Sequence, residues 1–263
     1  MAISDLVARV APVRCFKEGR QQGTASGFFY VHGDSLYFVT NRHVVIKAEE
    51  DFFPDELVLT LHTNPNDIRQ NGTLSLRLYD DGEPLWLEHP IGGKEIDVVA
   101  LSVNGEQVES RFFVRAFSAA DHISQDVDIS IGEDVLVIGY PMGFHDVMHN
   151  LPLVRNAIMA SVYPVPFEGK PIILIDSRLH RGTSGSPVLT KPTQMIRRTD
   201  GSTSMLGQPV SFLVGVHSAT VDVLDRDPEQ DEPLGLNVVW FASLIPDIVM
   251  QGSARLGALP EHA

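Results

Sequence analysis

The chain is poor in cysteine, since Cys15 is the only one among its 263 residues. A lone thiol cannot form a disulfide within the chain, so packing alone must hold the fold together. The residues around Cys15 do not resemble a turn that presents a catalytic thiol. We therefore expect neither a disulfide scaffold nor a cysteine enzyme.

Long apolar runs are absent as well. Nowhere do about 18 apolar residues stand together, as a transmembrane helix requires, so the sequence predicts no membrane partner. Residues 1–6 also lack the basic stretch and apolar core of a secretory signal. We expect a cytoplasmic protein if no leader has been removed.

Positive charge is scarce. The chain has 20 Lys and Arg against 34 Asp and Glu, which gives a net charge of −14. Nucleic acids bind to concentrated basic surfaces, and the only tight basic pair here is Arg197-Arg198, so we expect no nucleic-acid partner. The acidic runs 49–56 and 222–232 are typical of solvated surface.

Helical periodicity is also scarce, whereas short apolar or alternating runs bounded by Gly, Pro, Asn and Asp are frequent. That pattern is typical of an all-β protein. The best helix candidates are residues 4–10 and 243–250, and Ser243 can cap the second. Strands are expected over residues 27–31, 36–40, 57–62, 74–79, 98–103, 135–140, 172–175, 187–189, 212–216 and 236–241.

A polar stretch over 117–130 separates two strand-rich halves without a long Pro/Gly-rich linker. We therefore predict a single domain over 1–263, with one barrel in 1–117 and a second in 118–263. Polar connecting loops are expected over 64–72, 191–208 and 222–233.

The sharpest motif is RGTSGSP at residues 181–187. Gly182 permits backbone angles that let its own N–H and that of Ser184 converge on one point, while Gly185 leaves the serine hydroxyl uncovered. An ordinary Ser/Gly-rich turn has the same composition, so the motif does not establish a nucleophile by itself.

A serine nucleophile requires a histidine base and a group that orients this base. His43 follows the strand-like run 37–40, and Asp97 stands at the start of the hydrophobic run 98–101. A carboxylate beside a hydrophobic strand is costly unless it is paired. His43 and Asp97 are therefore the candidates for the base and the orienting acid.

Four segments occur in an order that is informative: GTASGFF (23–29), FVTNRHVV (38–45), IDVVAL (96–101) and GTSGSP (182–187). With them the chain resembles the trypsin-like serine peptidases, particularly the disulfide-free bacterial HtrA-type and glutamyl endopeptidase branches. The resemblance covers nearly the whole chain. It implies an all-β fold of two six-stranded antiparallel β-barrels, as in chymotrypsin, with a short C-terminal helix.

The same resemblance implies a serine endopeptidase with the triad order His, Asp, Ser. His43 is then the general base, Asp97 holds its tautomer, and Ser184 attacks the substrate carbonyl. Gly182 and Ser184 supply the oxyanion-hole N–H groups. The implied substrate is a protein or peptide, and no cofactor or metal is implied.

Two departures from the family pattern matter. Thr183 stands where digestive relatives carry an aspartate that pairs with a newly cut N-terminus, so we do not expect activation by N-terminal cleavage. The chain also ends soon after its last helix candidate, which leaves no room for a PDZ domain. Substrate recognition is therefore expected from the catalytic domain or from a separate regulatory or targeting partner.

The resemblance places a specificity pocket around the strand that contains Val216, His217 and Ser218. His217 matches a histidine that meets the acidic side chain of the substrate in glutamyl endopeptidases, and Arg178 lies near the expected pocket base. Two alternatives stay open. A cationic pocket favours cleavage after Glu or Asp, and a neutral pocket favours small apolar residues, as in HtrA-type enzymes.

Other functions fit less well. An α/β-hydrolase needs a second glycine where Ser186 stands. His145 and His149 would share one face of a helix over 144–150, but no third metal ligand is close in sequence. The remaining alternative is a catalytically inactive binding or sensor module on the same fold.

Overall fold

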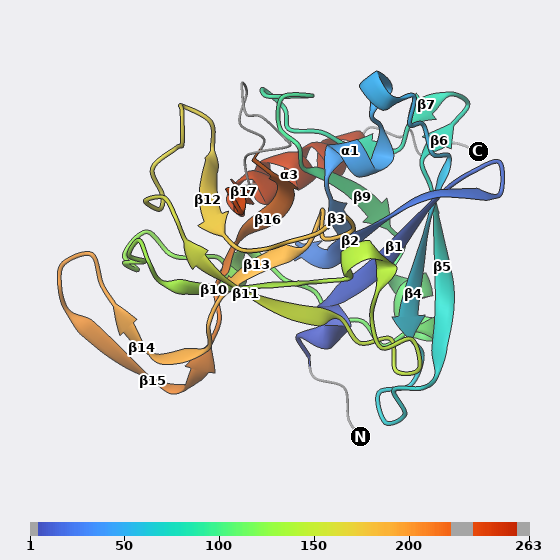
Figure 1. The fold of residues 1–263 in the computed structure, drawn as a ribbon. Coiled ribbons are helices and arrows are strands. Elements are labelled where there is room, and N and C mark those ends of the chain that lie inside the picture. The colour runs from blue at the N-terminus through green and yellow to red at the C-terminus, as the bar shows by residue number, and fades with distance from the viewer. Residues whose placement is uncertain (1–4, 222–233, 257–263) are drawn as a thin grey trace.

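The computed structural model describes residues 5–221 and 234–256. They form an all-β structure in which the first half builds a seven-stranded sheet and the second half a closed six-stranded barrel (Figure 1). From edge to edge, the sheet consists of β5 (Asn71–Arg77), β4 (Glu56–His62), β1 (Val10–Lys17), β2 (Arg20–His32), β3 (Ser35–Thr40), β9 (Val99–Val103) and β8 (Trp86–Leu87). The barrel consists of β10 (Asp134–Gly139), β11 (Leu153–Met159), β12 (Ile172–Asp176), β17 (Leu236–Phe241), β16 (Leu213–Thr220) and β13 (Pro187–Thr190).

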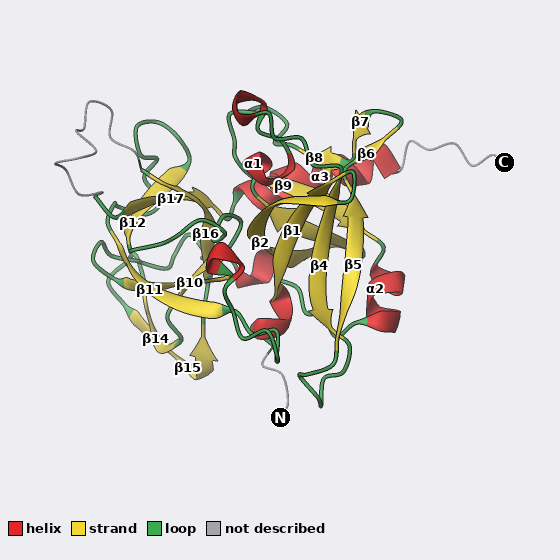
Figure 2. Cartoon of the chain, turned by 45° about the vertical axis from the view of Figure 1, so that its right-hand side comes forward, coloured by secondary structure: helices red, strands yellow, loops and turns green. Residues whose placement is uncertain are grey.

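Two hairpins lie outside these sheets: β6 (Tyr79–Asp80) pairs with β7 (Glu83–Pro84), and β14 (Thr193–Arg197) pairs with β15 (Thr203–Val210). The helices are α1 (Arg42–Val45), α2 (Gly105–Arg111) and α3 (Leu244–Leu256), with short 3₁₀ turns at Val7–Arg9, Ala48–Glu50, Ala119–Asp121 and Pro141–Gly143. Figure 2 shows the sheet and the barrel side by side, with helices at their margins. No helix within 5–221 and 234–256 is long and apolar enough to cross a membrane.

The expected all-β double-barrel fold with a C-terminal helix is confirmed, with one difference in the first half. Within the described part of the chain, the edge strands β5 and β8 do not pair, so the first sheet stays open. β8 is only two residues long, too short to carry a ladder around to β5. Helix α3 packs against β8 and β9.

Local sequence explains how the first strands pair. Glu18 and Gly19 both have positive φ, 49° and 73°, which is the type I′ turn that suits a two-residue hairpin between β1 and β2. A Cβ atom at Gly27 in β2 would lie 2.3 Å from the ring of Phe38 in β3. Only glycine allows β3 to pack this closely.

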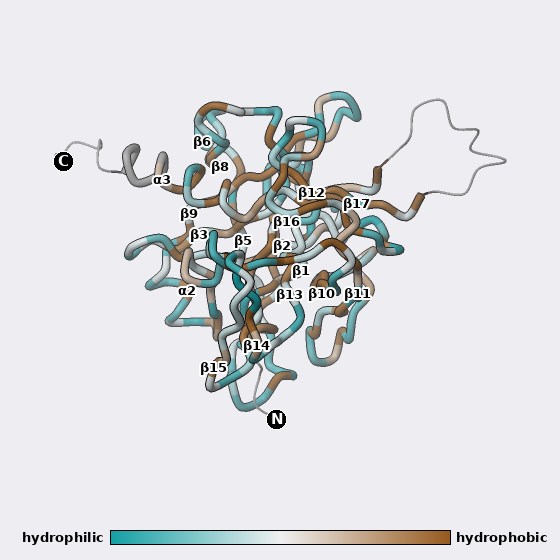
Figure 3. Tube along the Cα trace, turned by 90° about the vertical axis from the view of Figure 1, so that its left-hand side faces the viewer, coloured by the Kyte–Doolittle hydropathy of each residue, from teal (hydrophilic) through white to brown (hydrophobic). Residues whose placement is uncertain are grey.

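Two hydrophobic cores hold the molecule together. One lies within the first sheet and includes Phe29 and Phe38, while the other fills the barrel and extends to Phe28 of the sheet and to Ile245 of α3. Hydrophobic stretches run along the barrel strands in Figure 3. The hydroxyl of Tyr37 donates to a backbone carbonyl of α3 at 3.3 Å, so the end of the chain is tied back to its first half.

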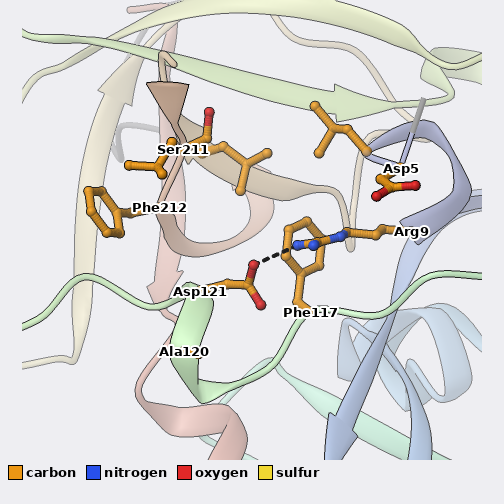
Figure 4. Close-up of a pocket in the computed structure, with 10 residues that line it drawn as sticks. Asp5, Arg9, Phe117, Ala120, Asp121, Ser211 and Phe212 are labelled. Carbon is orange, nitrogen blue, oxygen red and sulfur yellow. Dashed lines mark hydrogen bonds and ion pairs between the residues drawn. The ribbon is translucent and has the colours of Figure 1, made fainter. Parts of the chain in front are cut away.

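The segment between the two halves is bonded to the start of the chain. Phe117 exchanges two backbone hydrogen bonds with β2, both of 2.8 Å. Arg9 donates to Asp121 at 2.7 Å, and its guanidinium lies 4.6 Å from the centre of the Phe117 ring (Figure 4). The boundary near residue 117 stays a prediction.

Several local predictions need correction. Residues 4–10 do not form a helix of that length: within the described part a three-residue 3₁₀ turn, Val7–Arg9, leads directly into β1. Residues 191–208 were expected to be a loop but contain the β14–β15 hairpin, whose strands are mostly exposed and polar. The expected loop at 64–72 connects β4 to β5, and the one at 222–233 lies outside the described residues.

Candidate active site

His43 lies in α1, the single helical turn that directly follows β3. Asn41 anchors this turn, because its buried side chain donates to the backbone carbonyl of Asp97 at 2.7 Å. About a third of the His43 side chain, 30%, is exposed. The imidazole is thus held by the protein on one side and open to a ligand on the other.

Asp97 stands two residues before β9, which pairs with β3 so that Thr40 faces Val99. This register brings Asp97 beside His43. Its Oδ1 accepts from the backbone N–H of His43 at 2.9 Å, and its Oδ2 lies 2.7 Å from His43 Nδ1. Because an ionised carboxylate only accepts, Nδ1 carries the proton and Nε2 of the neutral ring presents a lone pair. A general base requires this tautomer.

Ser218, predicted only as a substrate-binding residue, completes the environment of Asp97. Its hydroxyl donates to Asp97 Oδ2 at 2.6 Å. Burial acts to raise the pKa of Asp97, but hydrogen bonds from His43 and Ser218 and the charge of His43 outweigh it and hold this pKa below its usual value. Asp97 is therefore ionised at neutral pH, although it lies in a largely buried position.

Ser184 lies in the turn between β12 and β13. Gly182 and Gly185 on either side of it have φ of 89° and 82°, a region that suits glycine. A Cβ atom at Gly182 would lie 2.5 Å from the backbone nitrogen of Met142, and one at Gly185 would lie 2.1 Å from the carbonyl oxygen of Ser26. Both glycines are thus required by conformation and by space.

The backbone N–H groups of Gly182 and Ser184 have no acceptor among the hydrogen bonds of the described residues. Neighbouring groups hold the turn in place. Met142 N–H donates to the carbonyl of Arg181 at 2.5 Å, and Thr183 donates its side-chain hydroxyl to the carbonyl of His180 at 2.7 Å. Two free N–H groups flanking a serine are what an oxyanion hole needs.

The Ser184 hydroxyl donates to the backbone carbonyl of Ser218 at 3.0 Å rather than to His43. Hydrogen bonds between catalytic groups are often long or absent in an empty site and form only when substrate binds. A rotation of the Ser184 side chain is therefore needed before His43 can take its proton.

A cleft of about 630 Å³ brings the predicted residues together. His43, Gly182 and Ser184 line it, together with His217 and Ser218. Asp97 lies behind His43, on the side of the imidazole away from Nε2. Residues distant in sequence thus meet around one opening.

Two predicted substrate-binding residues do not line this cleft. Val216 is fully buried in the barrel core, and Arg178 is exposed beyond the end of β12, where its carbonyl accepts from Arg155. The prediction that placed them in the pocket is corrected, because β16 is buried over Leu213–Ser218 and sequence alternation does not indicate which side chains face outward.

His217 lines the cleft but is almost completely buried, with 2% exposed. Its Nδ1 lies 3.0 Å from the carbonyl of Thr183, which can only accept, so Nδ1 carries the proton. Burial lowers the pKa of His217 to about 4. The side chain is therefore neutral at neutral pH, with its Nε2 an acceptor.

The other candidate groups have structural partners. His149 Nδ1 lies 2.7 Å from Asp146, and His145 Nδ1 lies 2.7 Å from the carbonyl of Gly143, in a segment that is not helical. No group of three or more potential metal ligands occurs within residues 5–221 and 234–256. Burial raises the pKa of the Cys15 thiol to about 12, which keeps it protonated.

Similarity to known proteins agrees with this arrangement. Residues 25–196 match the family profile described as "Trypsin-like peptidase domain", which spans more than half of the chain. No curated protein matches the chain.

Two solved structures share the fold. The serine endoprotease from Yersinia pestis aligns over 95% of this chain and 64% of its own, with 16% identity and a TM-score of 0.54. The protease Anisep from Arthrobacter nicotinovorans aligns over 94% of this chain and 96% of its own, with 12% identity and a TM-score of 0.53. The chain therefore spans less than two thirds of the Yersinia structure. The fold and the sequence profile agree, and the chain belongs to the family of trypsin-like peptidases.

Proposed function

We propose that the protein is a serine endopeptidase that hydrolyses peptide bonds with the triad His43, Asp97 and Ser184. The observation that carries this proposal is the 2.7 Å contact between Asp97 Oδ2 and His43 Nδ1, at the cleft that Ser184 and two free N–H groups also line. An ionised acid, a histidine in the tautomer of a base, and a serine held between two glycines support acyl transfer.

In the first half-reaction, Ser184 Oγ turns from the Ser218 carbonyl toward His43. The hydroxyl proton passes to His43 Nε2 while Oγ bonds to the substrate carbonyl carbon. The negative charge on the carbonyl oxygen is stabilised by the N–H groups of Gly182 and Ser184. When the C–N bond breaks, His43 gives its proton to the leaving amine, and an acyl-enzyme remains.

In the second half-reaction, water attacks the acyl carbon and His43 Nε2 takes its proton. The intermediate then releases the new carboxyl group, and the proton returns to Ser184 Oγ. Throughout, Asp97 stabilises the imidazolium without becoming protonated. Every proton is returned, so the cycle consumes only water and the peptide bond.

A fluorophosphonate probe tests the proposal, because it bonds only to an activated serine hydroxyl. We expect stoichiometric labelling of the wild-type protein and none of Ser184→Ala, and we expect a chelator to leave labelling unchanged. A protein that folds normally but never labels would instead be an inactive binding module on the same fold.

We further propose that the specificity pocket favours small uncharged side chains. Arg178 lies outside the cleft, and the neutral His217 offers an acceptor, which repels a carboxylate. Protonating His217 at pH 7 from a pKa of about 4 would cost about 4 kcal/mol. The cationic pocket considered from the sequence therefore lacks both of its expected charges.

A peptide-library digest tests this preference. We expect cleavage mainly after Val, Ala or Leu, with the same preference in Arg178→Ala. Cleavage mainly after Glu, abolished in His217→Ala but retained in Arg178→Ala, would show that the substrate carboxylate protonates His217 and that the pocket is acid-specific.

A further inference from the structure

Ser26 is a polar residue buried where the two halves meet. It lies in β2, and none of its surface is exposed. The residue that follows it, Gly27, packs against Phe38 of the same sheet. A buried hydroxyl is costly unless its hydrogen bonds are satisfied, so the partners of Ser26 indicate its role.

Two of these partners belong to the nucleophile turn of the other half. Ser26 Oγ donates to the carbonyl of Gly182 at 2.8 Å, and the backbone N–H of Ser26 donates to the carbonyl of Ser184 at 2.9 Å. The residue thus binds the turn at both of the positions that supply free N–H groups.

The remaining partners fix Ser26 itself. Its Oγ accepts from the backbone N–H of Tyr140 at 2.9 Å, at the end of β10. Its carbonyl accepts from the hydroxyl of Thr40 at 2.9 Å, and Thr40 ends β3, the strand that leads into the turn with His43. One residue therefore connects the strand of the base to the turn of the nucleophile.

The packing around Ser26 leaves little room for movement. A Cβ atom at Gly185 would lie 2.1 Å from the Ser26 carbonyl oxygen, and one at Gly139 would lie 2.8 Å from Ser26 Oγ. Both neighbours approach as closely as a glycine permits. A shift of Ser26 would therefore be transmitted to the nucleophile turn.

Resting on the function proposed above, we propose that Ser26 is a positioning residue that aims the oxyanion-hole N–H groups. The N–H of Gly182 lies between two carbonyls that are each held by a hydrogen bond. Met142 holds that of Arg181 at 2.5 Å, and Ser26 holds that of Gly182 at 2.8 Å. Without Ser26 Oγ, the second carbonyl is free to rotate, and the N–H groups lose their common direction.

The test is Ser26→Ala, which removes Oγ and keeps the backbone bond to Ser184. We expect kcat to fall roughly tenfold to a hundredfold with KM nearly unchanged, since small displacements of catalytic groups have effects of this size. The affinity for a peptide boronic acid, whose tetrahedral adduct uses the oxyanion hole, should fall by a similar factor. Binding of a substrate peptide in the Ser184→Ala background should not change.

The matched control is Ser161→Ala. Ser161 Oγ accepts from the backbone N–H of Leu174 at 2.9 Å, within the barrel and outside the cleft. It should keep the wild-type kcat. Ser26→Cys retains size and a weak donor, so it should fold even if Ser26→Ala does not, with an intermediate kcat. A wild-type kcat in both Ser26 variants, or equal losses in Ser161→Ala, would overturn the proposal.

Amide hydrogen exchange over residues 180–186 separates this inference from the proposed function. We expect faster exchange there in Ser26→Ala and unchanged exchange in Ser161→Ala, whether or not the protein hydrolyses peptides. If the wild type neither labels nor hydrolyses, the proposed function fails. Unchanged exchange in Ser26→Ala would overturn the positioning role separately.

Discussion

Ser184→Ala should lower kcat for peptide hydrolysis by on the order of 10⁶-fold, the size seen when a triad nucleophile is removed. The substitution deletes the only oxygen placed to attack, while the N–H groups of Gly182 and residue 184 remain. KM should change little, because the hydroxyl contacts Ser218 in the empty site rather than a substrate. Steady-state hydrolysis of a fluorogenic peptide measures both constants.

Ser186→Ala is the matched control for this experiment. Ser186 lies two residues further along the same turn, but it is fully buried and does not line the cleft. Its hydroxyl has no partner in the part of the chain that the structure describes. We expect a rate close to that of the wild type. If Ser186→Ala were inactive and Ser184→Ala active, the nucleophile would be misassigned.

Much of the fold could be predicted from the sequence because strands with one buried face leave a local pattern. β4 alternates between half-buried and buried positions over most of its length, and it was found. β1 was missed because it pairs on both sides, with β2 and β4, and is buried almost throughout. The β14–β15 hairpin was missed for the opposite reason, since most of its residues are exposed.

The candidate triad was also predictable, because its residues stand in short motifs at strand ends. The contacts that connect these motifs were not. Ser218 reaches Asp97 across 121 residues, and Ser26 reaches Gly182 across 156. A serine before a glycine in an otherwise apolar strand was the available signal for Ser26. Its partners depend on how the two halves meet, which no local pattern encodes.

The specificity pocket shows the limit most clearly. His217 and Val216 are adjacent and both buried, yet only His217 lines the cleft. Sequence spacing placed Arg178 near the pocket base, but the chain turns outward after β12 and leaves it exposed. A single position decides whether a charge lies in the pocket or in solvent, and spacing alone does not resolve it.

Asp97→Asn should lower kcat by about 10⁴-fold, as for the acid of a serine-protease triad. Asp97 Oδ2 now accepts from His43 Nδ1 and from the hydroxyl of Ser218, and Oδ1 accepts from the backbone of His43. An amide has one acceptor and one donor group. With its oxygen kept by the backbone N–H, its NH₂ would face Nδ1 and favour the tautomer that carries the proton on Nε2, which cannot take a proton from Ser184.

The control is Asp67→Asn, which removes the same charge from an exposed carboxylate whose partner is Arg69. It should leave kcat unchanged. Fluorophosphonate labelling of Asp97→Asn should slow in parallel with kcat, whereas KM should stay near the wild-type value, because Asp97 lies behind His43 and contacts no substrate. A loss of less than tenfold in Asp97→Asn would mean that another acid orients His43, and the 2.7 Å contact between Asp97 and His43 would then be structural.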